Sequence, residues 1–251
     1  MTEQRDGGVI IVTMNWPEKR NALGPEDTRE VGDALAAAGA SAAVGVVLTG
    51  NGAFCAGGDL AQFAALSASV SIADLRHRIY ENVHSVLRSI KACPVPVAAA
   101  VDGPAVGLGL DYAVACDLCF VGSRGWFQQG WAIPGLIHGA GGSGFIQRSS
   151  GTQATWRLVA EQERLDGAAA AALGLAEAVD GAAIDAAVAR LAGLGGLPRP
   201  TLEAYVDLLR GERWPSDEFF GRCADYQAQF IGSQAFRDQA QVILEQRSRR
   251  G

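Results

Sequence analysis

The chain has 251 residues, 49% of them hydrophobic and 19% charged, which is enough to bury a sizeable core in one domain or in one domain with an appendage. The formal net charge is −6, and the 21 lysine and arginine residues are scattered except at Arg247–Arg250, which argues against a nucleic-acid-binding surface. No apolar run reaches the length of a membrane span, and Thr2–Gly8 is too polar for a signal peptide, so we expect a soluble, cytoplasmic protein without a membrane partner.

The first half of the chain alternates strand and helix patterns. Apolar, β-branched runs predict strands, and apolar residues at helical spacing predict amphipathic helices. The predicted elements are strand Val9–Met14, loop Asn15–Leu23, helix Pro25–Gly39, strand Val44–Leu48, a short helix after Asp59, a long helix from Ile72 to Ile90, strand Val97–Val101, helix Gly109–Ala115 and strand Asp117–Val121. This alternation with short turns predicts an α/β layer architecture.

Two of the turns in this region are rich in glycine and alanine. Gly52–Leu60 (GAFCAGGDL) and Asp102–Asp117 (DGPAVGLGLDYAVACD) each follow an apolar strand and lead into a helix. Such turns expose backbone N–H groups, and the helix that follows adds the positive end of its dipole. If both turns face one point, they can stabilise a negative charge that develops on an oxygen atom.

The second half of the chain is mostly helical. The loop Gly135–Gly144 contains a formal G-x-G-x-x-G, but no good strand precedes it, so the context of a dinucleotide site is missing. We expect helices over Gln153–Gln162, after Asp166 and over Ile184–Leu194. The stretch Thr201–Gln246 has no strand pattern and predicts a helical appendage.

The five cysteines are Cys55, Cys93, Cys116, Cys119 and Cys223. Their odd number and spacing do not form a disulfide framework. The C-x-x-C at Cys116–Cys119 has no second pair and no nearby histidine, so we expect buried structural thiols and no metal site.

Four ordered motifs resemble the crotonase, or enoyl-CoA hydratase/isomerase, superfamily. They are VTMNWPEKRNAL, GAFCAGGDL, PVPVAAAVDGPAVGLGLDYAVACDLCFV and GLIHGAGGSGFIQR, and the later LDGAAAAALGLAEAVDG also fits. The resemblance implies a crotonase-like spiral of ββα units with a C-terminal helical region. It divides the chain into a core with an acyl-CoA site, residues 1–195, and a helical trimerisation region, residues 196–251. It also implies a homotrimer or a dimer of trimers, and an acyl-CoA substrate without any further cofactor.

The resemblance also implies site residues. In the family two backbone N–H groups hold the thioester oxygen, and by position these belong to Ala56 and Leu108. The residues that correspond to the CoA site are Arg20, Ala22, Leu23, Ala56, Gly57, Gly58, Asp59, Leu60, Gly107 and Leu108. Asp59 is also a good helix N-cap.

The acid/base positions depart from the hydratase pattern. Hydratases of the family carry one glutamate at each of two positions, whereas this chain has Asp111 at the first and Trp131 at the second. An indole N–H is only a hydrogen-bond donor, so Trp131 cannot exchange a proton with a substrate carbon and lines the pocket instead. Asp111 is therefore the expected acid/base, with His138 as a possible second group.

Several reactions agree with this set of residues. With Asp111 beside an enolate, the chain could catalyse proton transfer at the α-carbon, isomerisation, decarboxylation or cleavage of a carbon–carbon bond. An alternative is an acyl-CoA-binding protein whose acid/base pair has decayed.

Overall fold

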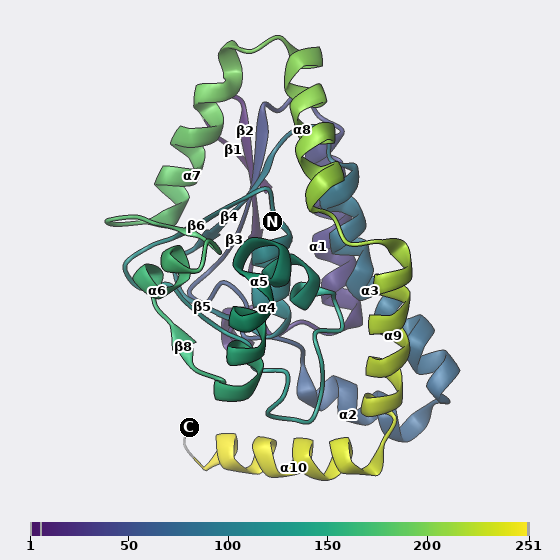
Figure 1. Cartoon of the computed structure of the whole chain (residues 1–251). Helices are drawn as coiled ribbons and strands as arrows, with labels where there is room; N and C mark the ends of the chain where they lie inside the picture. The colour runs from purple at the N-terminus through teal and green to yellow at the C-terminus, as the bar shows by residue number, and fades with distance from the viewer. Residues whose placement is uncertain (1, 6, 250–251) are drawn as a thin grey trace.

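The computed structural model of the chain describes residues 2–5 and 7–249 and has a six-stranded sheet at its centre (Figure 1). The strands of this sheet, in their spatial order, are β1 (Thr2–Arg5), β2 (Val9–Met14), β3 (Gly45–Gly50), β4 (Val97–Val101), β6 (Leu118–Val121) and β9 (Glu177–Ala178). The first pair is antiparallel and every later pair is parallel. The predicted α/β architecture is confirmed.

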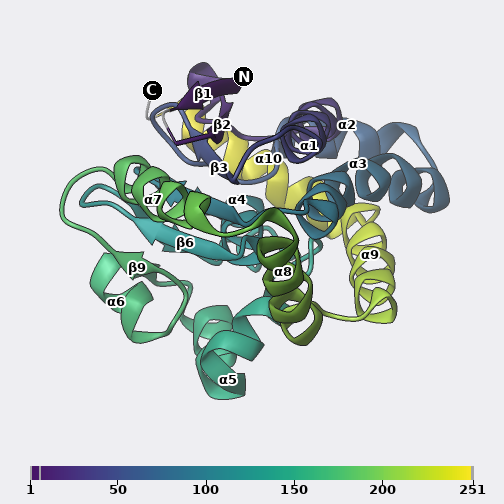
Figure 2. The same ribbon diagram turned by 90° about the horizontal axis from the view of Figure 1, so that it is seen from above.

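Helices cover both faces of this sheet, because strand side chains alternate between the two faces. Ile11 and Val47 pack with α7 (Ala183–Ala192) on one face. Val12 and Val46 face the larger core on the other side. That core includes α1 (Pro25–Gly39), α3 (Ile72–Ala92) and α4 (Leu108–Ala115), and Figure 2 shows α7 and the pair α1 and α3 as separate layers.

A second, three-stranded sheet is formed by β5 (Pro104–Val106), β7 (Trp126–Gln128) and β8 (Arg164–Leu165). The sequence does not predict these strands, because two or three residues are too few to show a period. They matter for the site, since β5 leads directly into α4 and β7 leads into the loop that carries Trp131 and His138.

Helix α5 (Gly142–Glu161) begins well before the predicted start at Gln153. Its first residues, Gly-Ser-Gly, have low helix propensity, so the sequence pattern does not reveal this start. The helix is broken at Gly151, whose φ is 79°, and the predicted helix is its second half. Helix α6 (Gly167–Ala172) is capped by Asp166, as predicted.

The rest of the chain, after the 3-10 turn Gly193–Gly196, forms α8 (Arg199–Arg213), α9 (Asp217–Ile231) and α10 (Gln234–Ser248). Figure 1 shows α8 and α9 along one side of the molecule and α10 along its lower edge. Helix α9 packs on α3, and α10 returns to α2 (Leu60–Ser69), the helix that follows the first glycine-rich turn. The helical character of this region is as predicted, whereas a boundary at residue 195 and a role in trimerisation stay predictions.

Within residues 2–5 and 7–249, no helix combines the length and the apolar content that crossing a membrane requires.

Candidate active site

The two glycine-rich turns lie against each other. The Cys55 N–H donates to the Pro104 carbonyl at 3.0 Å, and the Val106 N–H donates to the Cys55 carbonyl at 2.9 Å. This bridge places the start of α4 directly on the first turn: a Cβ atom on Gly109 would lie 2.3 Å from the Cys55 carbonyl oxygen. Only glycine permits so close an approach, and the approach brings the start of α4 against the first turn.

Leu108 presents the first backbone donor. It is the first residue of α4, where an N–H group has no partner within the helix. Leu108 is buried, and its N–H forms no hydrogen bond with any residue that the structure describes. Buried backbone N–H groups are nearly always paired, so an unpaired one at this place indicates a donor that binds a ligand atom.

The predicted role of Ala56 does not fit the structure. The Ala56 N–H donates to the Arg20 carbonyl at 3.0 Å and is therefore not free to bind a substrate oxygen. Gly58, two residues later, has a different hydrogen-bonding geometry. The Leu23 N–H donates to the Gly57 carbonyl at 2.9 Å, and the Asp59 N–H donates to the Leu23 carbonyl at 3.0 Å. In this parallel bridge the N–H of the residue between them, Gly58, faces away from Leu23, and it has no hydrogen-bond partner among the described residues.

Asn21 holds the loop of Arg20–Leu23 against the first turn. Its side chain is buried, donates to the Ala53 carbonyl at 2.7 Å and accepts from the Trp16 N–H at 2.7 Å. Its φ of 54° is a left-handed conformation that asparagine adopts more readily than most residues. Asn21 is not predicted as a site residue, because a single asparagine in a loop carries no distinctive sequence signal.

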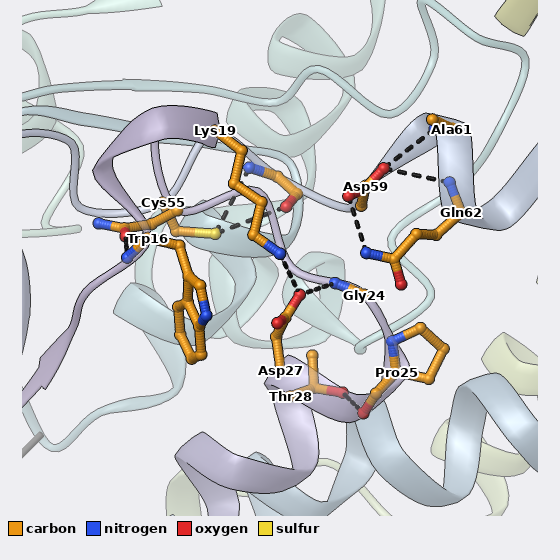
Figure 3. A network of polar contacts seen from close by, with 12 residues as sticks. Trp16, Lys19, Gly24, Pro25, Asp27, Thr28, Cys55, Asp59, Ala61 and Gln62 are labelled. Atoms are coloured by element: carbon orange, nitrogen blue, oxygen red, sulfur yellow. Dashed lines mark hydrogen bonds and ion pairs between the residues drawn. The ribbon is translucent and has the colours of Figure 1, made fainter.

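The predicted CoA-binding segments meet at the start of α2 (Figure 3). The Asp59 carboxylate accepts from the Ala61 and Gln62 N–H groups, both at 3.1 Å, and so caps this helix as the sequence suggested. On the neighbouring loop the Lys19 Nζ atom lies 2.6 Å from Asp27 Oδ2, which also accepts from the Gly24 N–H.

Arg247 lies near both Arg20 and Asp59. Arg20 is exposed, and Arg247 comes from the last turns of α10. Burial, and then the positive charge of Arg20, lower the pKa of Arg247, whereas the Asp59 carboxylate raises it. Neither arginine forms an ion pair with another described residue, so two cations without an ion-pair partner lie in this region. Arg20 is a predicted site residue, whereas Arg247 is not, because only the return of α10 to α2 brings Arg247 here.

Asp111 is fully buried one helical turn after Leu108 and accepts hydrogen bonds on both carboxylate oxygens. The Trp131 indole Nε1 donates to Oδ2 at 3.1 Å, and His138 Nδ1 lies 2.6 Å from Oδ1. The predicted residues Asp111, Trp131 and His138 therefore form one hydrogen-bonded group. Gly142 makes room for it, since a Cβ atom there would lie 1.9 Å from Asp111 Oδ1. Trp131 also lies beside Gly107, where a Cβ atom would be 3.6 Å from the indole ring.

The loop that carries His138 is held on both sides by polar side chains, one buried and one half-buried. Gln227 of α9 accepts from the Ile137 N–H at 3.0 Å, and His84 Nε2 of α3 lies 3.0 Å from the Gly139 carbonyl oxygen. Burial lowers the pKa of His84, so its ring is neutral near pH 7 and its Nε2–H can donate to this carbonyl. Neither Gln227 nor His84 belongs to a sequence motif that connects it with the site.

Cys55 lies within the first turn, but it is not a nucleophile. Its thiol is buried, and burial raises its pKa to about 12. A thiolate is the reactive form of cysteine, so at neutral pH this thiol is inert. In the part of the chain that the structure describes, no three histidine, cysteine, aspartate or glutamate side chains are grouped so as to hold a metal ion.

Comparison with known proteins identifies related chains. The family model Enoyl-CoA hydratase/isomerase matches residues 4–192. A probable enoyl-CoA hydratase of Rhodobacter capsulatus is 33% identical over 67% of this chain and 63% of its own length. A probable enoyl-CoA hydratase of Mycobacterium tuberculosis is 32% identical over 84% of this chain and 81% of its own. The alignments with other curated relatives span as little as 46% of the relative's length.

Solved structures have the same fold. The crystal structure of an enoyl-CoA hydratase from Polaromonas sp. JS666 is 31% identical, with a TM-score of 0.78 and coverage of 89% of this chain and 87% of that chain. An enoyl-CoA hydratase from Bacillus halodurans, at 20% identity, matches with a TM-score of 0.85 over 96% of this chain and 98% of its own, which shows the fold. The predicted crotonase-like fold with its C-terminal helical region is thus confirmed.

Proposed function

The chain belongs to the enoyl-CoA hydratase/isomerase family, and we propose that it is an enzyme that binds an acyl-CoA thioester and stabilises the enolate formed at the thioester carbonyl. The observation that carries the proposal is the free, buried N–H of Leu108 at the start of α4, next to the Gly52–Leu60 turn. A preorganised donor of this kind stabilises a developing oxyanion without reorganising during the reaction.

Gly58 is the proposed second donor, in place of Ala56. The Gly58 N–H faces away from Leu23 and is unpaired among the described residues, whereas the Ala56 N–H is used by Arg20. Loss of one such donor costs roughly 2.7–4 kcal/mol of transition-state stabilisation.

The CoA moiety is proposed to bind where Arg20–Leu23 meets the start of α2. CoA carries several phosphate charges, and the surplus positive charge of Arg20 and Arg247 beside Asp59 suits a polyanion. The Ala61 and Gln62 N–H groups at the N-terminus of α2 already donate to Asp59, so phosphate recognition falls to the two arginines.

Proton transfer is assigned to the hydrogen-bonded pair of Asp111 and His138. Addition of water by two carboxylates does not fit, because the second position is Trp131, whose N–H is already donated to Asp111. The pair fits a single proton transfer next to an enolate, as in isomerisation, decarboxylation or cleavage of a carbon–carbon bond. Binding of acyl-CoA without turnover is the second candidate, favoured by the engagement of both Asp111 oxygens.

Exchange of the α-protons of an acyl-CoA in D₂O tests the enolate directly, whatever the later steps of the reaction are. We expect the protein to bind acyl-CoAs in a thermal-shift assay and to incorporate deuterium at the α-carbon. Hydration of crotonyl-CoA should be slow compared with this exchange. Binding without exchange would support the second candidate, and the absence of any thermal shift at millimolar acyl-CoA would contradict both.

The Leu108 donor can be removed by a single substitution. Proline is tolerated in the first turn of a helix and has no N–H, so Leu108→Pro deletes the donor. We expect Leu108→Pro to slow exchange by about 10²–10³-fold. Leu108→Ala, which also truncates the side chain but keeps the N–H, is the matched control and should stay much closer to the wild type. Equal rates for the two variants would contradict the role of the Leu108 N–H.

A further inference from the structure

A mostly apolar cleft of about 450 Å³ lies between the His138 loop, α5 and α9. Its walls include Leu136, Val159 and Phe219, and the exposed aromatic rings of Trp156 and Tyr226 stand at its edge. This volume lies within the range of about 300–1,000 Å³ that is typical of small-molecule sites. His138 is part of the wall, so the cleft reaches the buried polar pair.

The two members of the pair differ in what they can touch. Asp111 has no exposed surface, and its oxygens are taken by Trp131 and His138. A carboxylate only accepts hydrogen bonds, so the 2.6 Å contact places the proton of the histidine on Nδ1. In the neutral ring the other nitrogen, Nε2, carries a lone pair, and it forms no hydrogen bond with any described residue. His138 is therefore the member with a free basic atom.

We infer that the acyl chain of the substrate lies in this cleft and that His138 Nε2 is the catalytic base or acid that meets it, with Asp111 as a positioning residue. The inference rests on the proposed function and specifies its substrate class: acyl groups with an apolar body long enough to enter the cleft. Asp111 fixes the tautomer and orientation of the ring, as the aspartate of a catalytic triad does for its histidine.

The surroundings of His138 support this role, because they fix its position before any substrate binds. The Ile137 backbone is held by Gln227, and the Gly139 backbone is held by His84. Asp111 in turn is fixed by Trp131 and by the close packing of Gly142. Asp111 also lies three residues after Leu108 on α4, so the pair and the free N–H share one face of that helix. Asp111 of α4 contacts His138, and His138 lines the cleft, so the pair connects the helix of the free N–H to the cleft.

Affinity for saturated acyl-CoAs of increasing length tests the cleft. We expect calorimetry to show tighter binding from acetyl- to octanoyl-CoA, by up to about fourfold per buried methylene. Thr155 lines the cleft and Gln153 does not, although both lie on α5. Thr155→Trp should therefore weaken octanoyl-CoA binding and leave acetyl-CoA binding unchanged, and Gln153→Trp should change neither.

The outcomes of this series separate the two proposals. If no acyl-CoA binds, the proposed function itself is wrong. If acetyl- and octanoyl-CoA bind equally well, or if Thr155→Trp leaves octanoyl-CoA binding unchanged, the acyl chain lies elsewhere and only the inference about the cleft is overturned.

Deuterium exchange tests the role of His138. His138→Asn can still donate an N–H to Asp111 but has no basic atom, so we expect exchange to fall by about 10²–10⁴-fold with acyl-CoA binding retained. In His138→Ala, imidazole added to the buffer should restore part of the exchange through the cleft. Added imidazole should not restore exchange in Asp111→Ala, because the ring of His138 is still present there and only its orientation is lost. Wild-type exchange in His138→Asn, or imidazole rescue of Asp111→Ala in place of His138→Ala, would overturn the assignment.

Discussion

At the scale of single residues, hydrogen bonds decide which of several similar polar groups are free to meet a substrate. Ala56 and Gly58 are two residues apart in one turn, yet of these two N–H groups only that of Gly58 lacks a partner among the described residues, because Arg20 accepts from Ala56. Asp111 and His138 are both ionisable, yet only His138 reaches a cleft. The direction of each polar group, and not its type alone, decides which residues can meet a substrate.

His84 connects the pH dependence of stability to the loop that carries His138. Burial lowers its pKa below the ordinary value of 6.5, against the hydrogen bond to Gly139, which raises it. Below pH 6.5 His84 therefore binds a proton in the unfolded chain but stays neutral in the folded chain. The folded state consequently loses stability as pH falls. Between pH 6.5 and the lowered folded-state pKa, this loss approaches about 1.4 kcal/mol per pH unit.

We expect His84→Gln to lose part of this pH dependence, since glutamine does not titrate and can still donate an N–H to Gly139. Urea unfolding at pH 7.5, 6.5 and 5.5 measures the free energy of unfolding for each chain. His77→Gln, which replaces an exposed histidine of the same helix, is the matched control and should follow the wild type. Identical pH slopes for His84→Gln and the wild type would contradict the prediction.

At the scale of elements, one arginine joins α8 to the core. Arg210 is buried and donates to both carboxylate oxygens of Asp117, at 2.8 and 2.5 Å. It also donates to the Val95 carbonyl at 3.0 Å. Asp117 in turn accepts from the Val97 N–H at 2.7 Å, at the start of β4. The pair thereby anchors α8 to the segment between the end of α3 and the start of β4 in the central sheet.

Removal of Arg210 should lower the free energy of unfolding far more than removal of an arginine in a surface ion pair. Arg210→Met leaves Asp117 partly buried without its partner, and we expect a loss of about 3–5 kcal/mol in the free energy of unfolding. Arg190→Met breaks an exposed pair with Glu177 and should cost about 0–1 kcal/mol. Urea denaturation of both variants provides the comparison, and similar losses would show that the buried pair does not anchor α8.

At the scale of the whole molecule, α8 carries an apolar stripe that the chain itself leaves uncovered. Tyr205, Leu208 and Leu209 are 55%, 67% and 69% exposed, and their spacing places them on one face of the helix. Contiguous exposed apolar groups of this kind indicate an interaction surface. We propose that this stripe contributes to self-association, in agreement with the homotrimer or dimer of trimers that the family resemblance implies.

We expect multi-angle light scattering to give the mass of an oligomer for the wild-type chain. The double variant Leu208→Glu with Leu209→Glu should shift it towards the monomer, because two charges would be buried without partners. Asp207→Asn alters an exposed polar residue between the stripe positions and should keep the wild-type mass. A monomeric wild type, or a double variant that assembles normally, would contradict the proposal.

Local patterns in the sequence determined most of the secondary structure and the place of the site. The helix over Pro25–Gly39, the cap at Asp59 and the buried parallel strands all follow from residue type and period. The two glycine-rich turns point to backbone donors for the same reason, since each combines a strand end, small residues and a helix start. The short strands β5 and β7 escaped prediction because three residues show no period.

Only the tertiary structure decided which of these groups face one another. The carbonyl of Arg20 uses the Ala56 N–H, the return of α10 brings Arg247 to Asp59, and the loop before α5 brings His138 to Asp111. These contacts join residues far apart in the chain, and their formation depends on packing between helices that no local pattern encodes. The sequence therefore determined the family and predicted the kind of site, whereas the folded chain determined which atoms of the candidate site remain free to act.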